Sequence, residues 1–383
     1  MELAAAPAGW PTTADRLLVG LLRLAAQSGS TRWSARLYAV LFYLPIVTVC
    51  VMSSQRLAQN GLAAYAGGQT LLQAAFASYF FGTLQALMVV PLLATVVCGR
   101  SRYWALLADV RSLMEEVARS VDVGRSYKSL ARRIWLLLAA ELLQFVLVAC
   151  MAYMSMKATV DPACSYYNAT VCFFVIASYA AIVLLQSSMF MIPAKFLYIT
   201  LILGSGFQAV NTELQSLAGG GHLKDWSRLA RLRSLQDRLS GTFSRLVTDM
   251  TPELIPAMVF GTISMVITFL VLFQSAQDGT LTSNLPVVFY SVVGAVLLLA
   301  VPCETGQHVL DLAAATRDSL LRLRWDGIRV GQEVGMFLEA ARRDLEHLGN
   351  LGYYRLQRST MVAIISTVIT YVIVFVQFST SGA

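Results

Sequence analysis

Charged side chains are scarce in this chain of 383 residues, of which 13% are charged and 57% hydrophobic, with a mean hydropathy of +0.63. Soluble domains carry about a quarter of charged residues, so this composition excludes an ordinary soluble domain. The histidines His222, His308 and His347 lie far apart, and no metal-ligand spacing, paired carboxylates within the apolar runs or phosphate-binding glycine loop is present. We therefore expect no enzyme, cofactor or metal site.

Long apolar runs dominate what remains. A membrane-spanning helix needs about 20 apolar residues, and seven runs are candidates. They cover 37–54, 72–99, 134–156, 171–194, 254–277, 284–303 and 359–380. The sequence therefore predicts an all-α membrane protein with seven transmembrane helices.

The basic residues between these runs predict the orientation. Alternate connections, beginning with the N-terminal segment, hold 26 Lys and Arg residues, whereas the other connections hold Arg56 and Lys157 alone. Because short loops rich in Lys and Arg stay inside the cell, we expect a cytoplasmic N-terminus and an extracellular C-terminus. The net charge of +7 then reflects topology and does not indicate a nucleic-acid partner.

Amphipathic helical patterns continue beyond the spans on the predicted cytoplasmic side. The pattern of the fourth span runs on to Leu217, and further apolar stripes follow in 229–246 and 330–348. We expect these helices to pack into a cytoplasmic anchor domain. The expected organisation is a cytoplasmic segment 1–36, four spans in 37–200, helical extensions 201–252, two spans in 253–303, cytoplasmic helices 304–352 and the seventh span in 353–383.

Several charged residues near the spans have predicted roles. The Leu-rich stretch 17–26 reads as a short amphipathic helix at the membrane surface, and Lys195 is expected to extend from its span toward the interface. Glu253 and Glu304 are expected to make contacts between helices. Glu141 is the one acidic residue inside a span, and its residue type alone leaves a structural and a functional role equally open.

The loop between the third and fourth spans carries signals of an extracellular position. Cys164 and Cys172 could form a local disulfide, and Asn168 begins an Asn-Ala-Thr glycosylation sequon. Short sequons arise by chance and a cysteine spacing proves no geometry, so each signal only agrees with the charge count.

The seventh span carries a mildly polar stripe at helical spacing. The stripe consists of Thr370, Ile373, Val374, Gln377 and Phe378. Polar residues in membrane helices join helices together as often as they line pores, and the residues by themselves leave both readings open.

The end of this span resembles a family signature. Thr370-Tyr371, five hydrophobic residues and Gln377-Phe378, preceded by the stretch 352–359, resemble the ending of insect gustatory receptors, which belong to the insect chemoreceptor superfamily together with the odorant receptors. The resemblance implies a ligand-gated, non-selective cation channel of four identical or related subunits in the plasma membrane of sensory neurons. It further implies a pore lined by the seventh helices, subunit contacts in the anchor domain, and a ligand pocket in the outer half of each subunit.

Candidates for that pocket are polar and aromatic residues of the outer half-bundle. They are Tyr79, Gln85, Gln144, Tyr153, Tyr179, Gln186, Phe269, Phe289 and Tyr290. Ligand cavities are mostly apolar with a few polar groups, which fits this set, although ordinary packing or an aromatic belt at the headgroups fits each residue too. The set permits a sugar or a bitter compound as the tastant.

Two other functions stay in consideration. A seven-helix receptor that signals through a G protein has the opposite topology, and this chain has neither an Asp-Arg-Tyr after the third span nor an Asn-Pro-x-x-Tyr in the seventh. A transporter is disfavoured because the spans show no repeated halves.

Overall fold

The described part of the chain consists almost entirely of helices. The computed structural model describes residues 12–24, 43–44, 47–48, 88–95, 100–166, 169–219, 225–277, 281–352 and 354–381. The helices are α1 (Thr12–Leu24), α4 (Arg100–Ser120), α5 (Gly124–Tyr166), α6 (Ala169–Gly219), α7 (Trp226–Gln277), α8 (Leu281–Leu321), α9 (Ile328–His347) and α10 (Arg358–Ser381). The predicted all-α class is confirmed.

Within the described residues, four helices contain stretches that are long and apolar enough to cross a membrane. These stretches are Ser126–Cys150, Tyr179–Gly219, Trp226–Phe269 and Ser291–Leu321, and α10 adds the shorter apolar stretch Arg358–Val374. The predicted third to seventh spans are thus helical and lie within longer helices. The predicted first span and most of the second lie outside the described residues.

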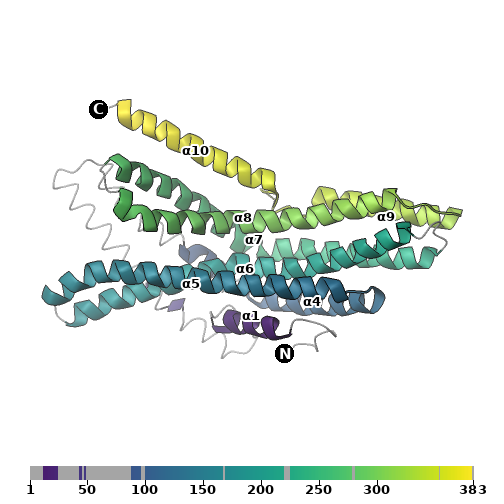
Figure 1. Cartoon of the computed structure of the whole chain (residues 1–383), viewed down its shortest axis with the longest axis horizontal. Coiled ribbons are helices and arrows are strands. Elements are labelled where there is room, and N and C mark those ends of the chain that lie inside the picture. Colours follow the sequence, from purple (N-terminus) through teal and green to yellow (C-terminus); the bar gives the residue numbers. More distant parts are fainter. Residues whose placement is uncertain are drawn as a thin grey trace.

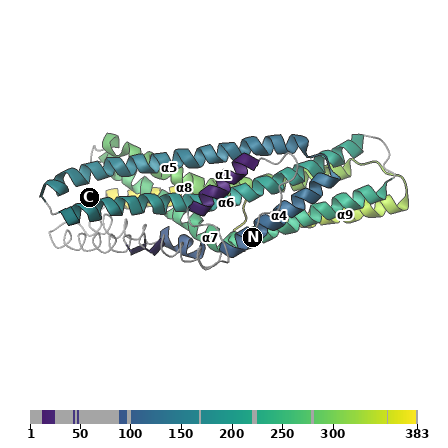
Figure 2. The same ribbon diagram turned by 90° about the horizontal axis from the view of Figure 1, so that it is seen from below.

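The helices α5 to α8 give the molecule its elongated shape (Figures 1 and 2). With 51 residues, α6 extends over about 75 Å, which is more than twice the thickness of the hydrocarbon layer. At one end of the molecule, α9 packs against α7 and α8, and α4 also packs against α6 and α7. The predicted packing of the helical extensions is confirmed, whereas their cytoplasmic location stays a prediction.

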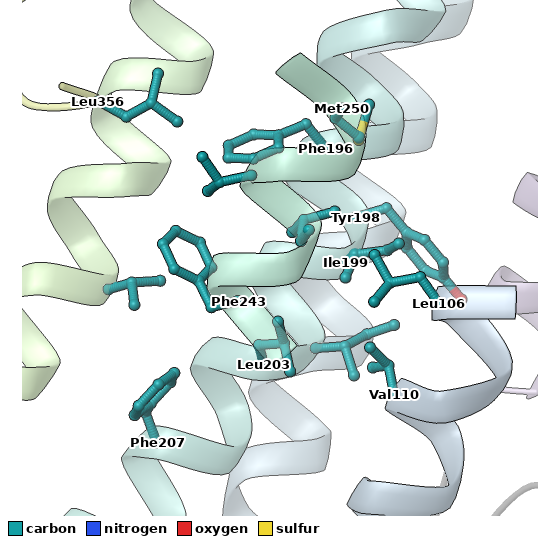
Figure 3. Close-up of a cluster of buried hydrophobic side chains, with 14 of the residues drawn as sticks. Leu106, Val110, Phe196, Tyr198, Ile199, Leu203, Phe207, Phe243, Met250 and Leu356 are labelled. Carbon is teal, nitrogen blue, oxygen red and sulfur yellow. The ribbon is translucent and has the colours of Figure 1, made fainter. Parts of the chain in front are cut away.

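Figure 3 shows why the extensions pack together. Phe196, Leu203 and Phe207 lie on one stripe of α6 and are fully buried against Phe243 of α7 and Val110 of α4. Together with Ile199, the three α6 residues recur at steps of three and four, so α6 presents one continuous apolar face. Burial of this face stabilises the bundle.

The predicted short amphipathic helix near the N-terminus is present as α1, and its location at the membrane surface stays a prediction. Leu18 and Leu22, on one face of α1, are fully buried in the chain's own core. Asp15 forms an ion pair of 2.6 Å with Arg111 of α4 and accepts a hydrogen bond from Tyr198 of α6. Since its partners are buried, Asp15 anchors α1 to the bundle.

The connection from α9 to α10 is held closely against α8. Leu356 is fully buried, and its amide donates a hydrogen bond of 2.8 Å to the carbonyl of Gly349. Gly306 of α8 permits this contact, because a Cβ added there would lie 2.5 Å from the Cβ of Leu356. Arg358, at the start of α10, also pairs with Glu304 of α8 at 2.9 Å. The predicted helix contact of Glu304 is confirmed.

Candidate functional site

The helix α10 lies at the edge of the helical bundle and contacts α7 and α8 with one side only (Figure 1). Val368 is buried on that side. The predicted stripe residues Thr370, Ile373, Val374 and Gln377 are all exposed on the single chain. The Thr370 hydroxyl donates a hydrogen bond of 2.9 Å to the carbonyl of Ser366 in the same helix. Because the hydroxyl has this partner, Thr370 can lie against either apolar groups or water. The side chain of Phe378 lies outside the described residues.

A cleft separates α10 from α7 along part of their length. It encloses about 700 Å³ and is lined on the α7 side by Met258, Val259, Thr262 and Val266. Thr367 and Tyr371 of α10 also line it. α10 is therefore loosely packed against the rest of the chain, in contrast to the dense core of the α4–α6–α7 extensions.

A small cavity lies inside the bundle between α6, α7, α8 and the helical segment 88–95. It encloses about 50 Å³, and its polar lining comes from Gln186, Ser264 and Ser291. Its volume corresponds to one or two water molecules and is far below the ~300 Å³ of small ligand pockets. The Phe190 ring lies close to Gly294 in the cavity wall, because a Cβ added at Gly294 would lie 3.0 Å from this ring. A ligand at this point has to separate the helices.

The structure brings few of the predicted pocket residues together. Gln186 lines the small cavity, whereas Gln144 is buried at a different cleft between α5, α6 and α8. Tyr153 and Phe289 are 58% and 64% exposed on the single chain and contribute to neither wall.

The other candidates add little to this picture. Phe269 is half-buried and packs against the main core, and Tyr179 is half-buried on α6. Tyr79, Gln85 and Asn168 lie outside the described residues, and the side chains of Tyr290, Cys164 and Cys172 are not described either. The ligand-binding, disulfide and glycosylation assignments therefore stay predictions. The polar wall residues Ser264 and Ser291 were missed, because single serines in apolar spans carry no pattern that separates cavity from packing.

A buried ion pair lies where α6 and α7 meet the segment 88–95. The ammonium of Lys195 is 2.5 Å from the carboxylate of Glu253, and each side chain is 1% exposed. Thr95 donates a hydrogen bond of 3.0 Å to the same carboxylate oxygen, and the Tyr103 ring lies 5.6 Å from the ammonium. The prediction that Lys195 extends to the interface is therefore wrong, since α7 offers it a carboxylate inside the bundle. The predicted helix contact of Glu253 is confirmed.

The environment of this pair also keeps Tyr103 neutral. Burial first, and then the negative charge of Glu253, raise the pKa of Tyr103 far above its ordinary value. Its ring therefore supplies a neutral aromatic face to the ammonium of Lys195, which is a favourable arrangement for a buried cation.

Comparison with known proteins gives the class. The family model described as 7tm Chemosensory receptor matches residues 17–381, so the chain belongs to this family. A search of curated proteins finds no match. The structure of the insect olfactory receptor OR5 from Machilis hrabei in complex with eugenol is similar, with a TM-score of 0.70, 12% identity and coverage of 96% of this chain and 98% of the receptor.

A second structure of the same Machilis hrabei receptor matches with a TM-score of 0.59, 12% identity and the same coverage. At this identity the likeness concerns the fold. The fold of an insect chemoreceptor, predicted from the last span and the arrangement of helices, is thereby confirmed.

Proposed function

We propose that this chain is a subunit of a gustatory receptor that acts as a tastant-gated, non-selective cation channel. Family membership and the fold shared with an olfactory receptor bound to eugenol support a receptor for a small organic molecule. The gustatory-type ending from Thr370 to Phe378 favours taste over smell. Four subunits, identical or related, surround the pore in the plasma membrane of a sensory neuron, and the chain itself performs no enzymatic reaction.

The observation that carries the proposal is the uncovered face of α10. A helix with Thr370, Val374 and Gln377 on a face that its own subunit leaves exposed is suited to line a shared axis. Apolar rings of Val374 and Phe378 close such a pore by excluding water, while an uncharged amide ring of Gln377 admits cations of different sizes.

The position of the small cavity suggests how a tastant opens this pore. Because the cavity lies between α6, α7 and α8, a ligand that enlarges it moves α7 and α8 apart. Both helices contact α10, and α8 also holds the start of α10 through Glu304 and Arg358. Ligand binding therefore shifts α10. It favours this shifted state because the ligand's binding free energy stabilises only the state with enlarged cavities.

The test is recording from excised membrane patches that contain the expressed chain, with sugars, bitter compounds and amino acids applied in turn. We expect unitary cation currents without added nucleotide. Gln377→Ala and Phe378→Ala should change basal current or the reversal potential in mixed cations. Leu143→Ala, which truncates an exposed apolar side chain of α5, is the control and should change neither.

The two other functions give different results in the same recording. Loss of the response on excision indicates signalling through a G protein, and saturable flux without unitary events indicates a transporter. Unchanged permeation and gating in both α10 variants refutes the pore assignment.

A further inference from the structure

A second cleft, distinct from the small cavity, lies between α5, α6 and α8. It encloses about 340 Å³, within the lower part of the ~300–1,000 Å³ range of small-molecule sites. Its walls are mainly apolar and include Phe190, Leu197 and Leu297. Leu136 at its rim is 62% exposed, so the cleft opens on the side of α5 that faces lipid in the membrane.

Two polar side chains of α5 interrupt these apolar walls. Gln144 is 95% buried, and its Nε2 has no hydrogen-bond partner among the described residues. Glu141 lies one turn earlier on the same side of α5 and lines the same cleft. No ion pair or hydrogen bond of Glu141 occurs within the described part of the chain.

The nearest basic residue of the cleft does not supply the missing partner. Arg133 lies at the inner end, about 12 Å along α5 from Glu141 at ~1.5 Å per residue. Its guanidinium is 3.3 Å from Nε2 of His308 on α8. The cleft therefore has an occupied basic end and, in its apolar middle, an acidic group and an amide donor without partners.

We propose that this cleft binds an amphiphilic amine that enters from the bilayer. The protonated amine pairs with the Glu141 carboxylate, and an oxygen acceptor a few bonds away accepts a hydrogen bond from Nε2 of Gln144. The apolar body of the ligand packs against Phe190, Leu197 and Leu297. A neutral acyl chain fits the apolar walls equally well but leaves both polar groups unpartnered, and buried polar groups without partners are costly.

This ligand class follows from the cleft and not from the proposed tastant site. Gln186 and the two serines line the small cavity, which shares Phe190 alone with this cleft. Because the variants at Glu141 and Ala140 leave Phe190 in place, either site can fail its test without affecting the other. Occupation of the cleft fixes α5 against α6 and α8, and α8 contacts α10. The proposed site therefore lies where a membrane-soluble amine could influence the same helices as a tastant.

The test is photolabelling of the purified full chain in lipid nanodiscs with a ten-carbon primary amine that carries a diazirine, followed by peptide mass spectrometry. We expect labelled peptides within 133–144, 190–201 or 297–301. Unlabelled 1-amino-2-decanol should compete strongly. Decanol and decanoate, of equal chain length, should compete at least about tenfold more weakly, since they lack the charge-assisted contact to Glu141.

The variants separate the contact from a general effect on folding. Glu141→Gln should weaken competition by 1-amino-2-decanol about tenfold or more, and Glu141→Asp should retain most of it. Ala140→Phe fills the cleft from its exposed mouth and should remove the labelling, whereas Leu142→Ala, 65% exposed on the same helix, should leave it unchanged. Elution of every variant at the size of the unmodified protein is the check on folding.

Three results overturn the proposal. The first is photolabelling of the Glu141→Gln variant to the same extent as the unmodified chain. Another is competition by decanol equal to that by the amino alcohol, which identifies a groove for lipid chains. The third is stronger competition by decanoate, which assigns the cleft to an anion at Arg133.

Discussion

The buried pair of Lys195 and Glu253 gives a sharp prediction for stability. Each side chain is 1% exposed and the two charged atoms are 2.5 Å apart. Lys195→Met removes the ammonium and leaves the carboxylate with the Thr95 hydroxyl as its hydrogen-bond donor among the described residues. Breaking one side of a buried pair costs about 3–5 kcal/mol, so the folding equilibrium should fall by roughly two to more than three orders of magnitude.

Replacing both charges should recover most of this loss. In Lys195→Met with Glu253→Met, no charge stays buried, and two apolar side chains of similar size fill the space. Replacement of a buried ion pair by apolar residues is often neutral or even stabilising by about 1–4 kcal/mol. Thr95 keeps a partner in the double variant, because the carbonyl of Pro91 is also 3.0 Å from its hydroxyl and then accepts its proton.

The measurement is the free energy of unfolding of the purified chain, obtained by titrating a denaturing detergent into mixed micelles. The control is the pair of Arg245 and Asp109, which has a similar distance of 2.7 Å but side chains that are 53% and 55% exposed. Arg245→Met should cost no more than about 1 kcal/mol. Two results would refute the reasoning from burial. One is an equal loss of unfolding free energy in Lys195→Met and Arg245→Met, and the other is a double variant as unstable as Lys195→Met.

Three further outcomes follow from single contacts. Gly306→Ala places a Cβ 2.5 Å from that of Leu356 and 2.6 Å from its carbonyl oxygen, so we expect a loss of about 1–3 kcal/mol in the same titration. Asp15→Asn removes the charge that anchors α1, so hydrogen exchange of the backbone amides of 12–24 should become faster. Burial raises the pKa of Asp344 above its ordinary value, which means that the folded state holds this proton more tightly than the unfolded state. The free energy of unfolding should therefore decrease as pH rises from the unfolded pKa, near 3.8, through the raised pKa, and Asp344→Asn should remove this decrease.

Each of these outcomes has a control. Gly241→Ala, in a helix with nothing within 4 Å of the added Cβ, should be neutral or stabilising by up to about 1 kcal/mol. If Gly241→Ala also lowers the free energy of unfolding, the loss in Gly306→Ala does not come from a steric clash. Exchange of 12–24 that is unchanged by Asp15→Asn would show that apolar burial alone holds α1. A pH profile that Asp344→Asn leaves unaltered would assign the decrease to another group.

Much of the fold was predictable because it depends on local pattern. The lengths of the apolar runs predicted the spanning helices, and the steps of three and four in 229–246 predicted a face that is now seen buried. The stripe on the last span was found in the same way, since residues one turn apart share a side of a helix whatever surrounds it. A short motif at its end was enough to suggest the family.

The partners of charged and polar residues were not predictable in this way. Lys195 and Glu253 are 58 positions apart, and Asp15 and Arg111 are 96 apart. The periodicity of one helix does not specify which residue of another helix will lie against a given charged side chain. For the same reason Gln144, predicted to share a pocket with Gln186, belongs to a different cleft.

The sequence by itself therefore determined which segments are helical, which of their faces are apolar and which family they resemble. The tertiary structure decided which faces meet, which charges are paired inside the bundle, and which helix face the subunit leaves uncovered. The physical reason is that helix formation and amphipathicity are set by neighbours within a few residues, whereas ion pairs and cavities arise from surfaces that only folding brings together.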